Sequence, residues 1–182
     1  TVQQHHINLW ISTYVGKGGY GVVELCRDGT VKTYNELKST KIRTTEELRD
    51  GRIVIATNTG AAILNGDSVE RFITKADGLT NEMVLSVCEG DEGFFYLGTN
   101  GGGIYRIEED SGKKIGLEDG LDSEIILRIK KDPFENLYWI LTTNSICYMG
   151  AEEKVTVIEK FPSANNFDVF FDIRGRMCQK NR

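Results

Sequence analysis

Histidine, proline and long hydrophobic runs are scarce in this sequence, and each shortage excludes a class of protein. The only two histidines, His5 and His6, stand side by side near the start, where a structural or cloning-derived segment explains them better than a metal pair. The rest of the chain has no histidine base or zinc-ligating histidine, which argues against enzyme chemistry that needs one. The longest apolar runs, such as Leu137–Leu141, have about five residues, whereas a membrane span needs roughly 20. We therefore expect neither a transmembrane helix nor a signal peptide in this sequence.

Basic residues are also in deficit. The 182 residues include 22 Lys and Arg against 27 Asp and Glu, for a net charge of −5. Nucleic-acid binding needs a surplus of basic side chains on one face, so we expect no nucleic-acid partner. Only 2 prolines occur, but there are 20 glycines, which favours many tight turns between short strands and disfavours a helical bundle.

The four cysteines are far apart in the sequence. Cys26, Cys88, Cys147 and Cys178 form no C-x-x-C pair, so the sequence offers no zinc or redox motif. An even number permits two disulfides, but small buried side chains on strands are the better interpretation.

The most informative feature is an internal repeat. Residues 76–87 (ADGLTNEMVLSV) match residues 118–129 (EDGLDSEIILRI) at an offset of 42 residues. Strand-like segments that end in a threonine recur with a similar spacing, and their last residues are Thr13, Thr57, Thr99 and Thr143. A period of about 42–44 residues suits four short strands and their turns, which is one propeller blade. The predicted fold class is therefore all-β, with four-stranded antiparallel blades in a partial or incomplete propeller.

The phase of the repeat divides the chain into units of one β-propeller segment, 1–182. The expected units are 8–48, 49–90, 91–132 and 133–172, with a partial unit at 173–182. In the best-defined unit the expected strands are 84–89, 94–99, 103–109 and 113–117. The first and last units look incomplete, so part of a longer repeat array is favoured over a four-bladed closure in which 167–172 would pair beside 9–13.

The repeat unit resembles the two-component regulator propeller repeat. In the strongest copy the matching residues are Gly78, Leu79, Asn81, Val84, Val87, Asp91, Gly93, Tyr96, Leu97, Gly98, Thr99, Gly103, Ile104 and Tyr105. The next copy matches at Gly120, Leu121, Ser123, Ile126, Ile129, Asn136, Trp139, Ile140 and Thr143. Departures occur at both ends, with Glu36–Leu37 in place of Gly-Leu and Met177–Cys178 in place of a tryptophan-containing strand.

This resemblance implies a function and a location. In that family such propellers are non-catalytic, extracytoplasmic sensor regions, at the cell surface or in the periplasm, of membrane-anchored signal-transduction proteins. The output domain is a histidine kinase or a diguanylate cyclase, and segments 138–149 and 161–177 look most like the cyclase-linked members. Two alternatives stay open, a scaffold propeller that binds other proteins and, with less support, a propeller enzyme of the lyase or glycosidase type.

A glycine-rich stretch, Gly16–Val23, fits the pattern G-x-G-x-x-G-x-V and is followed by Lys32. A kinase-type phosphate loop would need the other kinase motifs, and a dinucleotide site would need a helix after the glycines; neither is present. The repeat explains the stretch as the turn after Thr13, equivalent to residues 100–103. We expect no nucleotide, no metal, no cofactor and no catalytic residue.

The candidate binding residues are polar side chains in the turns after each threonine and before the first strand of each unit. They are Tyr14, Lys17, Asn58, Thr80, Asn81, Asn100, Asp122, Ser123 and Asn144. In a propeller both kinds of turn open onto one face, so these residues would contact an unknown small molecule, with carbohydrate as one class, or a protein. The recurring aromatic residues Trp10, Tyr96 and Trp139 are interpreted as packing between blades. A homodimer is expected, because incomplete end blades leave faces and strand edges open.

Overall fold

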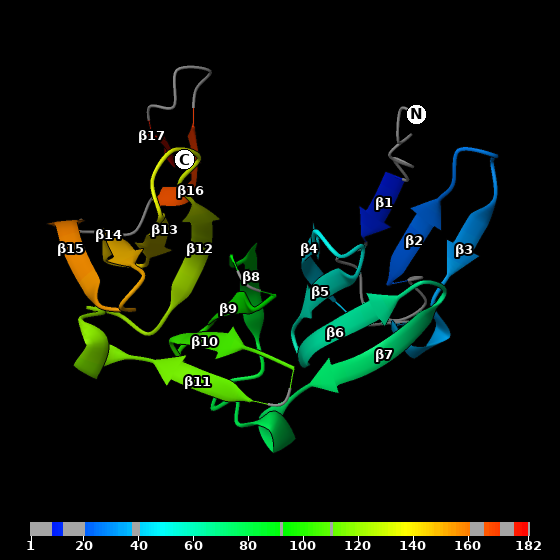
Figure 1. The fold of residues 1–182 in the computed structure, drawn as a ribbon, viewed down its shortest axis with the longest axis horizontal. Coiled ribbons are helices and arrows are strands. Elements are labelled where there is room, and N and C mark those ends of the chain that lie inside the picture. The colour runs from blue at the N-terminus through cyan, green and yellow to red at the C-terminus, as the bar shows by residue number, and fades with distance from the viewer. Residues whose placement is uncertain are drawn as a thin grey trace.

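The computed structural model describes residues 9–12, 21–37, 41–91, 93–109, 111–160, 166–171 and 177–181. Antiparallel sheets stand side by side in an open arc, with the first strand of each four-stranded sheet towards the inside and the last strand towards the outside (Figure 1). Each sheet is a simple meander, because strands that are consecutive in the chain are neighbours in the sheet. We number the sheets as blades 1 to 5.

Three of the five blades have four strands. Blade 2 contains β4 (Ile42–Glu47), β5 (Ile53–Thr57), β6 (Gly60–Asn65) and β7 (Ser68–Ile73). Blade 3 contains β8 (Val84–Glu89), β9 (Phe95–Thr99), β10 (Ile104–Ile107) and β11 (Gly112–Ile115). Blade 4 contains β12 (Ile126–Lys131), β13 (Leu137–Thr142), β14 (Ser145–Gly150) and β15 (Val155–Lys160). The predicted antiparallel four-stranded repeat is therefore confirmed for these three blades.

The end blades have fewer strands in the described part of the chain. Blade 1 contains β1 (Leu9–Ser12), β2 (Val22–Leu25) and β3 (Val31–Thr33), and blade 5 contains β16 (Asn166–Phe171) and β17 (Met177–Asn181). Among the described strands β1 pairs with β2 and β16 pairs with β17, so the four-bladed closure, with 167–172 beside 9–13, is not formed there. Each unit proposed from the sequence runs from the second strand of one blade to the first strand of the next. The sequence units are therefore shifted by one strand relative to the blades.

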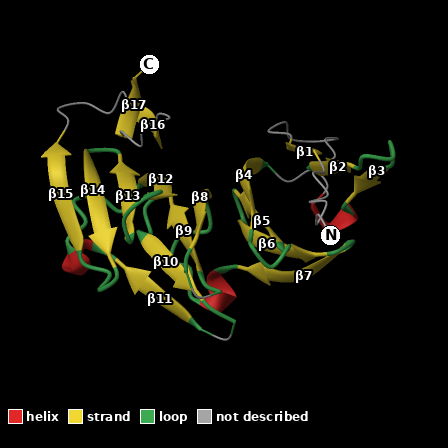
Figure 2. Ribbon diagram, turned by 45° about the horizontal axis from the view of Figure 1, so that its top comes forward, coloured by secondary structure: helices red, strands yellow, loops and turns green. Residues whose placement is uncertain are grey.

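Short helices connect the blades in place of crossover helices. The 3-10 helices η1 (Asn35–Leu37), η2 (Lys75–Asp77) and η3 (Leu117–Asp119) each follow the last strand of a blade (Figure 2). After η2 and η3 the chain turns at Gly78 and Gly120, which have left-handed backbone angles (φ +96° and +107°). In the part of the chain that the structure describes, no helix is long and apolar enough to cross a membrane.

Alternation along each second strand builds the hydrophobic core between blades. In β9, Phe95 and Leu97 are buried against blade 2, whereas Tyr96 is buried against blade 4, where its ring meets Tyr138 edge-on at 4.9 Å. Residue Trp139 of β13 occupies the place of Tyr96, because Tyr96 pairs with Arg106 of β10 and Trp139 with Tyr148 of β14. In blades 2 and 3, one row of side chains thus packs against the preceding blade and the alternate row against the next.

In blades 2, 3 and 4, the threonine at the end of the second strand fixes the following turn. Thr57 Oγ1 donates to the Gly60 carbonyl at 2.9 Å and accepts the Thr59 N–H at 3.0 Å. Thr99 Oγ1 bonds the Gly103 carbonyl at 2.8 Å and the Gly102 N–H at 3.0 Å in the same way. In blade 4 this role belongs to Thr142, which accepts the N–H groups of residues 144 and 145. The prediction that Thr143 is the equivalent threonine is therefore wrong by one residue.

The residue that opens each third strand explains the end of the glycine-rich stretch. Gly60 and Gly103 open or directly precede the third strands of blades 2 and 3, and Gly21 directly precedes β2, the equivalent strand of blade 1. All three have left-handed φ (+70° for Gly21, +117° for Gly60 and +78° for Gly103). A Cβ on Gly103 would lie 2.6 Å from the Ile115 carbonyl oxygen of the neighbouring strand, so only glycine fits without a shift. Gly21 therefore serves the same turn as Gly60 and Gly103, as the repeat predicted. Residues 16–20 lie outside the described residues.

Candidate functional site

The predicted binding residues in the described part of the chain lie where two kinds of turn meet. The turn after the second strand contacts the segment that leads into the first strand, since the Asn58 N–H donates to the Lys41 carbonyl at 3.3 Å and the Asn100 N–H to the Met83 carbonyl at 2.9 Å. In blade 4 the corresponding bond runs from the Thr143 N–H to the Ile125 carbonyl at 3.3 Å. Asn58, Asn100 and Thr143 are thus equivalent, and Asn144 is one residue further along the turn.

Asn81 joins these turns in blade 3. Its Nδ2 donates to the Asn100 carbonyl at 2.6 Å, and its Oδ1 accepts the Met83 N–H at 2.9 Å. Asn100 Nδ2 in turn lies 3.4 Å from Met83 Sδ. Beside them, the Thr80 N–H and Oγ1 lie 2.8 and 2.6 Å from the hydroxyl of the buried Tyr105. These side chains stabilise the turns because they form hydrogen bonds with groups of the same turns or of the strands beside them.

The same arrangement recurs in blade 4. Asp122 Oδ1 accepts hydrogen bonds from Ser145 Oγ at 2.6 Å and Thr142 Oγ1 at 3.2 Å. Ser123 Oγ lies 3.0 Å from Thr143 Oγ1 and accepts the Ile125 N–H at 3.2 Å. In blade 2, Asn58 Oδ1 accepts the Lys41 N–H at 3.3 Å. Among the predicted residues of blade 4, Asp122 and Ser123 are partly buried and Asn144 is exposed. The structure therefore groups these residues blade by blade within turns. Tyr14 and Lys17 lie outside the described residues.

A second feature lies on the inside of the arc, where the first strands β4, β8 and β12 lie side by side. A cavity of about 430 Å³ opens between them, and we call it the inner-strand pocket. Its lining comes from all three complete blades: Thr44, Glu46, Arg49, Ser86, Val87, Cys88, Glu89, Arg128, Ile129, Lys130 and Lys131. A volume of this size is within the range of small-molecule sites, about 300–1,000 Å³.

The repeat explains which residues line this pocket. Each first strand carries a β-bulge after its first residue, so that Thr44, Ser86 and Arg128 pair with equivalent residues of the second strands. Two residues further on stand Glu46, Cys88 and Lys130, on the same face of each strand. Two rows of equivalent positions therefore supply six of the pocket's side chains.

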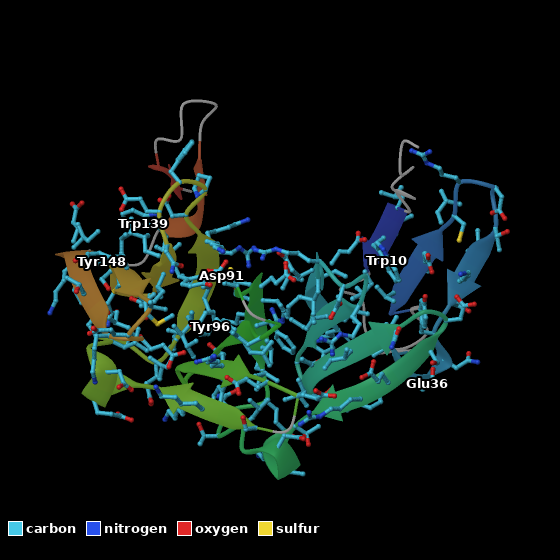
Figure 3. The ribbon with its side chains drawn as sticks, in the orientation of Figure 1. Trp10, Glu36, Asp91, Tyr96, Trp139 and Tyr148 are labelled. Atoms are coloured by element: carbon cyan, nitrogen blue, oxygen red, sulfur yellow. The ribbon has the colours of Figure 1, made fainter. Side chains whose placement is uncertain are left out.

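Basic side chains outnumber acidic ones in the inner-strand pocket. The Arg49 N–H donates to Glu89 Oε1 at 2.7 Å, and the Arg49 guanidinium lies 3.4 Å from Glu89 and 3.8 Å from Asp91. Lys131 is ion-paired with Asp91, which Figure 3 shows at the inside of the arc. Burial raises the pKa of Glu46, an effect that the positive charge of Lys130 partly opposes. Sequence reasoning missed this pocket, although the repeat positions that form it are visible in the sequence.

A larger cavity of about 610 Å³ lies between blades 2 and 3. Both arginines that line it already have bonding partners, since Arg71 bonds the Glu109 carbonyl at 2.6 Å and Asp77 at 2.9 Å. Arg52, which also lines it, pairs with Asp50 at 2.7 Å. The bond from Arg71 to the Glu109 carbonyl joins blade 2 to blade 3 beside this cavity.

The described cysteine and carboxylate side chains determine whether this part of the chain could bind a metal ion or carry an activated thiol. Among the described residues, no group of three or more His, Cys, Asp or Glu is placed to hold a metal ion. Burial raises the pKa of Cys88 to about 12 and that of Cys147 to about 11, so both thiols are protonated at neutral pH. Cys26, Cys88 and Cys147 are free, and Cys178 lies in β17, whose side chains are outside the described part.

Comparison with solved structures shows the propeller fold. No family model and no curated protein matches the sequence. The extracellular domain of a hybrid two-component system from B. thetaiotaomicron is similar at a TM-score of 0.79 and 20% identity over 94% of this chain. The extracellular domain of a one-component system from the same organism gives 0.76 and 15% over 96%. Virginiamycin B lyase from Staphylococcus aureus gives 0.78 and 14% over 100%.

This chain covers only part of each similar structure. It spans 24% and 27% of the two extracellular domains and 61% of the lyase. Identities of 20% or less show a common fold of repeated four-stranded blades and not a common activity. The suspected two-component regulator propeller family is consistent with the two extracellular domains among these similar structures.

Proposed function

We propose that this chain is part of an extracytoplasmic sensor propeller, non-catalytic itself, that binds a ligand and passes the event to an output domain of a membrane-anchored signalling protein. The observation that carries the proposal is the repeated blade, because extracellular domains of signalling systems are among the solved structures with a similar fold. A small-molecule ligand, with carbohydrate as one class, is proposed because a pocket of ligand size opens between the inner strands. Sensing further requires that the ligand bind two states of the attached protein with different affinity.

The lyase-like alternative has less support from the residues. A catalytically inactive variant of virginiamycin B lyase, solved with quinupristin, carries a histidine-to-alanine change. This chain has histidine only at positions 5 and 6, ahead of all its described strands. Residues 9–182 therefore contain no histidine that could correspond to it.

The test is a ligand screen by thermal shift with the purified chain. The probes are neutral sugars, carboxylated and sulfated sugars, amino acids and nucleotides, each titrated to saturation. A sensor should show a saturable rise in melting temperature with one chemical class, and that compound should be recovered chemically unchanged after prolonged incubation. Conversion of the compound would overturn the non-catalytic proposal, and no shift with any probe would overturn ligand sensing by this segment.

A further inference from the structure

One blade departs from the others at the positions that line the inner-strand pocket. Blade 2 places Thr44 and Glu46 there and blade 3 places Ser86 and Cys88, whereas blade 4 places Arg128 and Lys130. The bulged strand itself does not demand a cation, since small and acidic residues occupy the same positions in the other blades. Arg128 and Lys130 therefore concentrate positive charge on the blade 4 side of the pocket.

Part of this charge has a structural use. Arg128 Nη1 donates to the Leu85 carbonyl of β8 at 3.2 Å, and the Ile129 N–H donates to Ser86 Oγ at 3.0 Å, so these bonds tie β12 to β8. Lys130 is different, because it is exposed and no ion pair joins it to any residue in the described part of the chain. Its charge acts on Glu46, whose pKa it lowers, without forming an ion pair within 4 Å, so the ammonium group is available to contact a ligand.

The balance of charge in the pocket is opposite to that of the whole chain. Among its lining side chains four are basic (Arg49, Arg128, Lys130 and Lys131) and two are acidic (Glu46 and Glu89), whereas the chain carries a net charge of −5. Close to the basic groups lie the hydroxyls of Thr44 and Ser86 and the apolar side chains of Val87 and Ile129. A pocket that combines basic side chains, hydroxyl groups and apolar side chains suits a small molecule that carries a negative charge and also has some apolar surface.

We propose that the inner-strand pocket is the ligand site of this propeller and binds a small molecule through a carboxylate or sulfate group, with Lys130 as its principal cationic contact. This inference rests on the proposed sensor function and names the chemical class of its ligand. Both groups carry negatively charged oxygens that accept hydrogen bonds from lysine and arginine. The experiment below distinguishes a carboxylate from a sulfate. Arg128 contributes positive potential while it remains bonded to β8.

The experiment compares three sugars that differ only in one substituent. Glucose, glucuronate and glucose 6-sulfate are titrated against the purified chain at constant ionic strength, and binding is followed by thermal shift and calorimetry. We expect no saturable binding of glucose and saturable binding of glucuronate, glucose 6-sulfate or both. Whichever anion binds identifies the group that the pocket recognises.

Two matched variants locate the site. Lys130→Met should weaken anion binding at least tenfold. Because Lys130 also lowers the pKa of Glu46, the melting temperature of the free variant is measured to confirm that it is folded. Lys160→Met removes an exposed lysine from β15, the outermost strand of the same blade, and should leave binding unchanged.

Other outcomes would show whether the proposed site or the proposed sensor function is wrong. Equal weakening by both variants would show general charge attraction and overturn the site, as would the absence of anion binding. Binding of a neutral compound that Lys130→Met leaves unchanged would overturn this pocket while the sensor function stands. Binding of an anion followed by its conversion would support the site and overturn the non-catalytic function.

Discussion

At the scale of single residues, the threonine that ends the second strand of blade 4 shows how one hydroxyl can fix a turn. Thr142 is 1% exposed, and its Oγ1 accepts two backbone N–H groups of the turn at 2.9 and 3.0 Å. Loss of this oxygen leaves buried donors without a partner. We therefore expect Thr142→Val to lower the free energy of unfolding by about 1–3 kcal/mol, measured by urea denaturation.

The neighbouring threonine is the control for that variant. Thr143 is partly exposed, and its hydroxyl lies 3.0 Å from Ser123 Oγ in a region that water reaches. Thr143→Val should cost less than about 1 kcal/mol, as is typical of substitutions away from buried polar groups. A larger loss for Thr143→Val than for Thr142→Val would show that the equivalence among Thr57, Thr99 and Thr142 is wrong.

The raised pKa of Glu46 predicts how the stability of the protein depends on pH. Burial in the inner-strand pocket is the largest cause that raises the pKa of Glu46, the negative charge of Glu89 raises it further, and Lys130 lowers it. A carboxyl with a raised pKa in the folded state disfavours folding once it is ionised. The resulting penalty is absent below the pKa of the unfolded chain, near 4.3, and is complete above the raised pKa.

Glu46→Gln removes that penalty. The variant should match the wild-type melting temperature at acidic pH, below about 4, and exceed it increasingly as the pH rises towards 7. Thermal melts of both proteins across this range measure the difference, with Glu47→Gln, an exposed neighbour on β4, as control. A gap between wild type and Glu46→Gln that stays constant with pH would contradict the assignment.

At the scale of secondary-structure elements, one turn joins blade 4 to blade 3. Glu153 lies between β14 and β15 in left-handed backbone geometry (φ +57°) and is 5% exposed. Its carboxylate accepts hydrogen bonds from Tyr96 of β9 at 3.2 Å, Arg106 of β10 at 3.5 Å and Lys113 near the start of β11 at 2.6 Å. A single side chain thus contacts three strands of the preceding blade.

Removing this carboxylate should loosen the contact between the two blades. We expect Glu153→Ala to lower the free energy of unfolding by about 2–4 kcal/mol, because buried donors lose their acceptor, although the exposure of Lys113 reduces its share. Glu152→Ala, at the exposed neighbouring position, should stay within about 0.5 kcal/mol of wild type in the same denaturation experiment. Equal effects of the two variants would contradict a bridging role for Glu153.

The strands of the blades could be predicted from the sequence because turn glycines and apolar alternation recur with the period of one blade. The expected strand 84–89 is β8, and the expected strand 94–99 contains β9. The error at Thr143 has a local cause. The first hairpin of blade 4 is one residue longer than that of blade 3, since Lys131 pairs with Tyr138 but Glu89 with Phe95. Two threonines then follow in sequence, and only the hydrogen bonds show which one fixes the turn.

The inner-strand pocket could not be predicted in the same way. Its side chains come from three strands that lie about 40 residues apart, and the bulge after the first residue of each strand decides which face they occupy. The predicted turn residues were visible because short polar side chains mark turns, and that same property bonds Asn81 and Asp122 within their own loops.

At the scale of the whole molecule, the faces of the blades predict how the chain associates. Ile53, Ile55, Ala62 and Leu64 are buried on the blade 2 face that meets blade 1. By strand register, the equivalent residues of blade 1 are Leu9, Ile11, Val23 and Leu25. These form a continuous apolar row that faces away from blade 2, and Leu9 and Ile11 are 58% and 45% exposed.

An apolar face built for contact with another blade should drive association of the isolated chain. We expect the purified chain to self-associate with rising concentration, and Ile11→Lys to shift it towards monomer because the lysine places a charge in the centre of that row. Light scattering during size-exclusion chromatography gives the mass of both proteins over a range of concentrations. Phe134→Lys is the matched control, since Phe134 is 75% exposed but lies in a turn of blade 4, and it should leave the mass unchanged. A wild-type chain that remains monomeric and soluble at high concentration would overturn this prediction, as would equal dissociation by both variants.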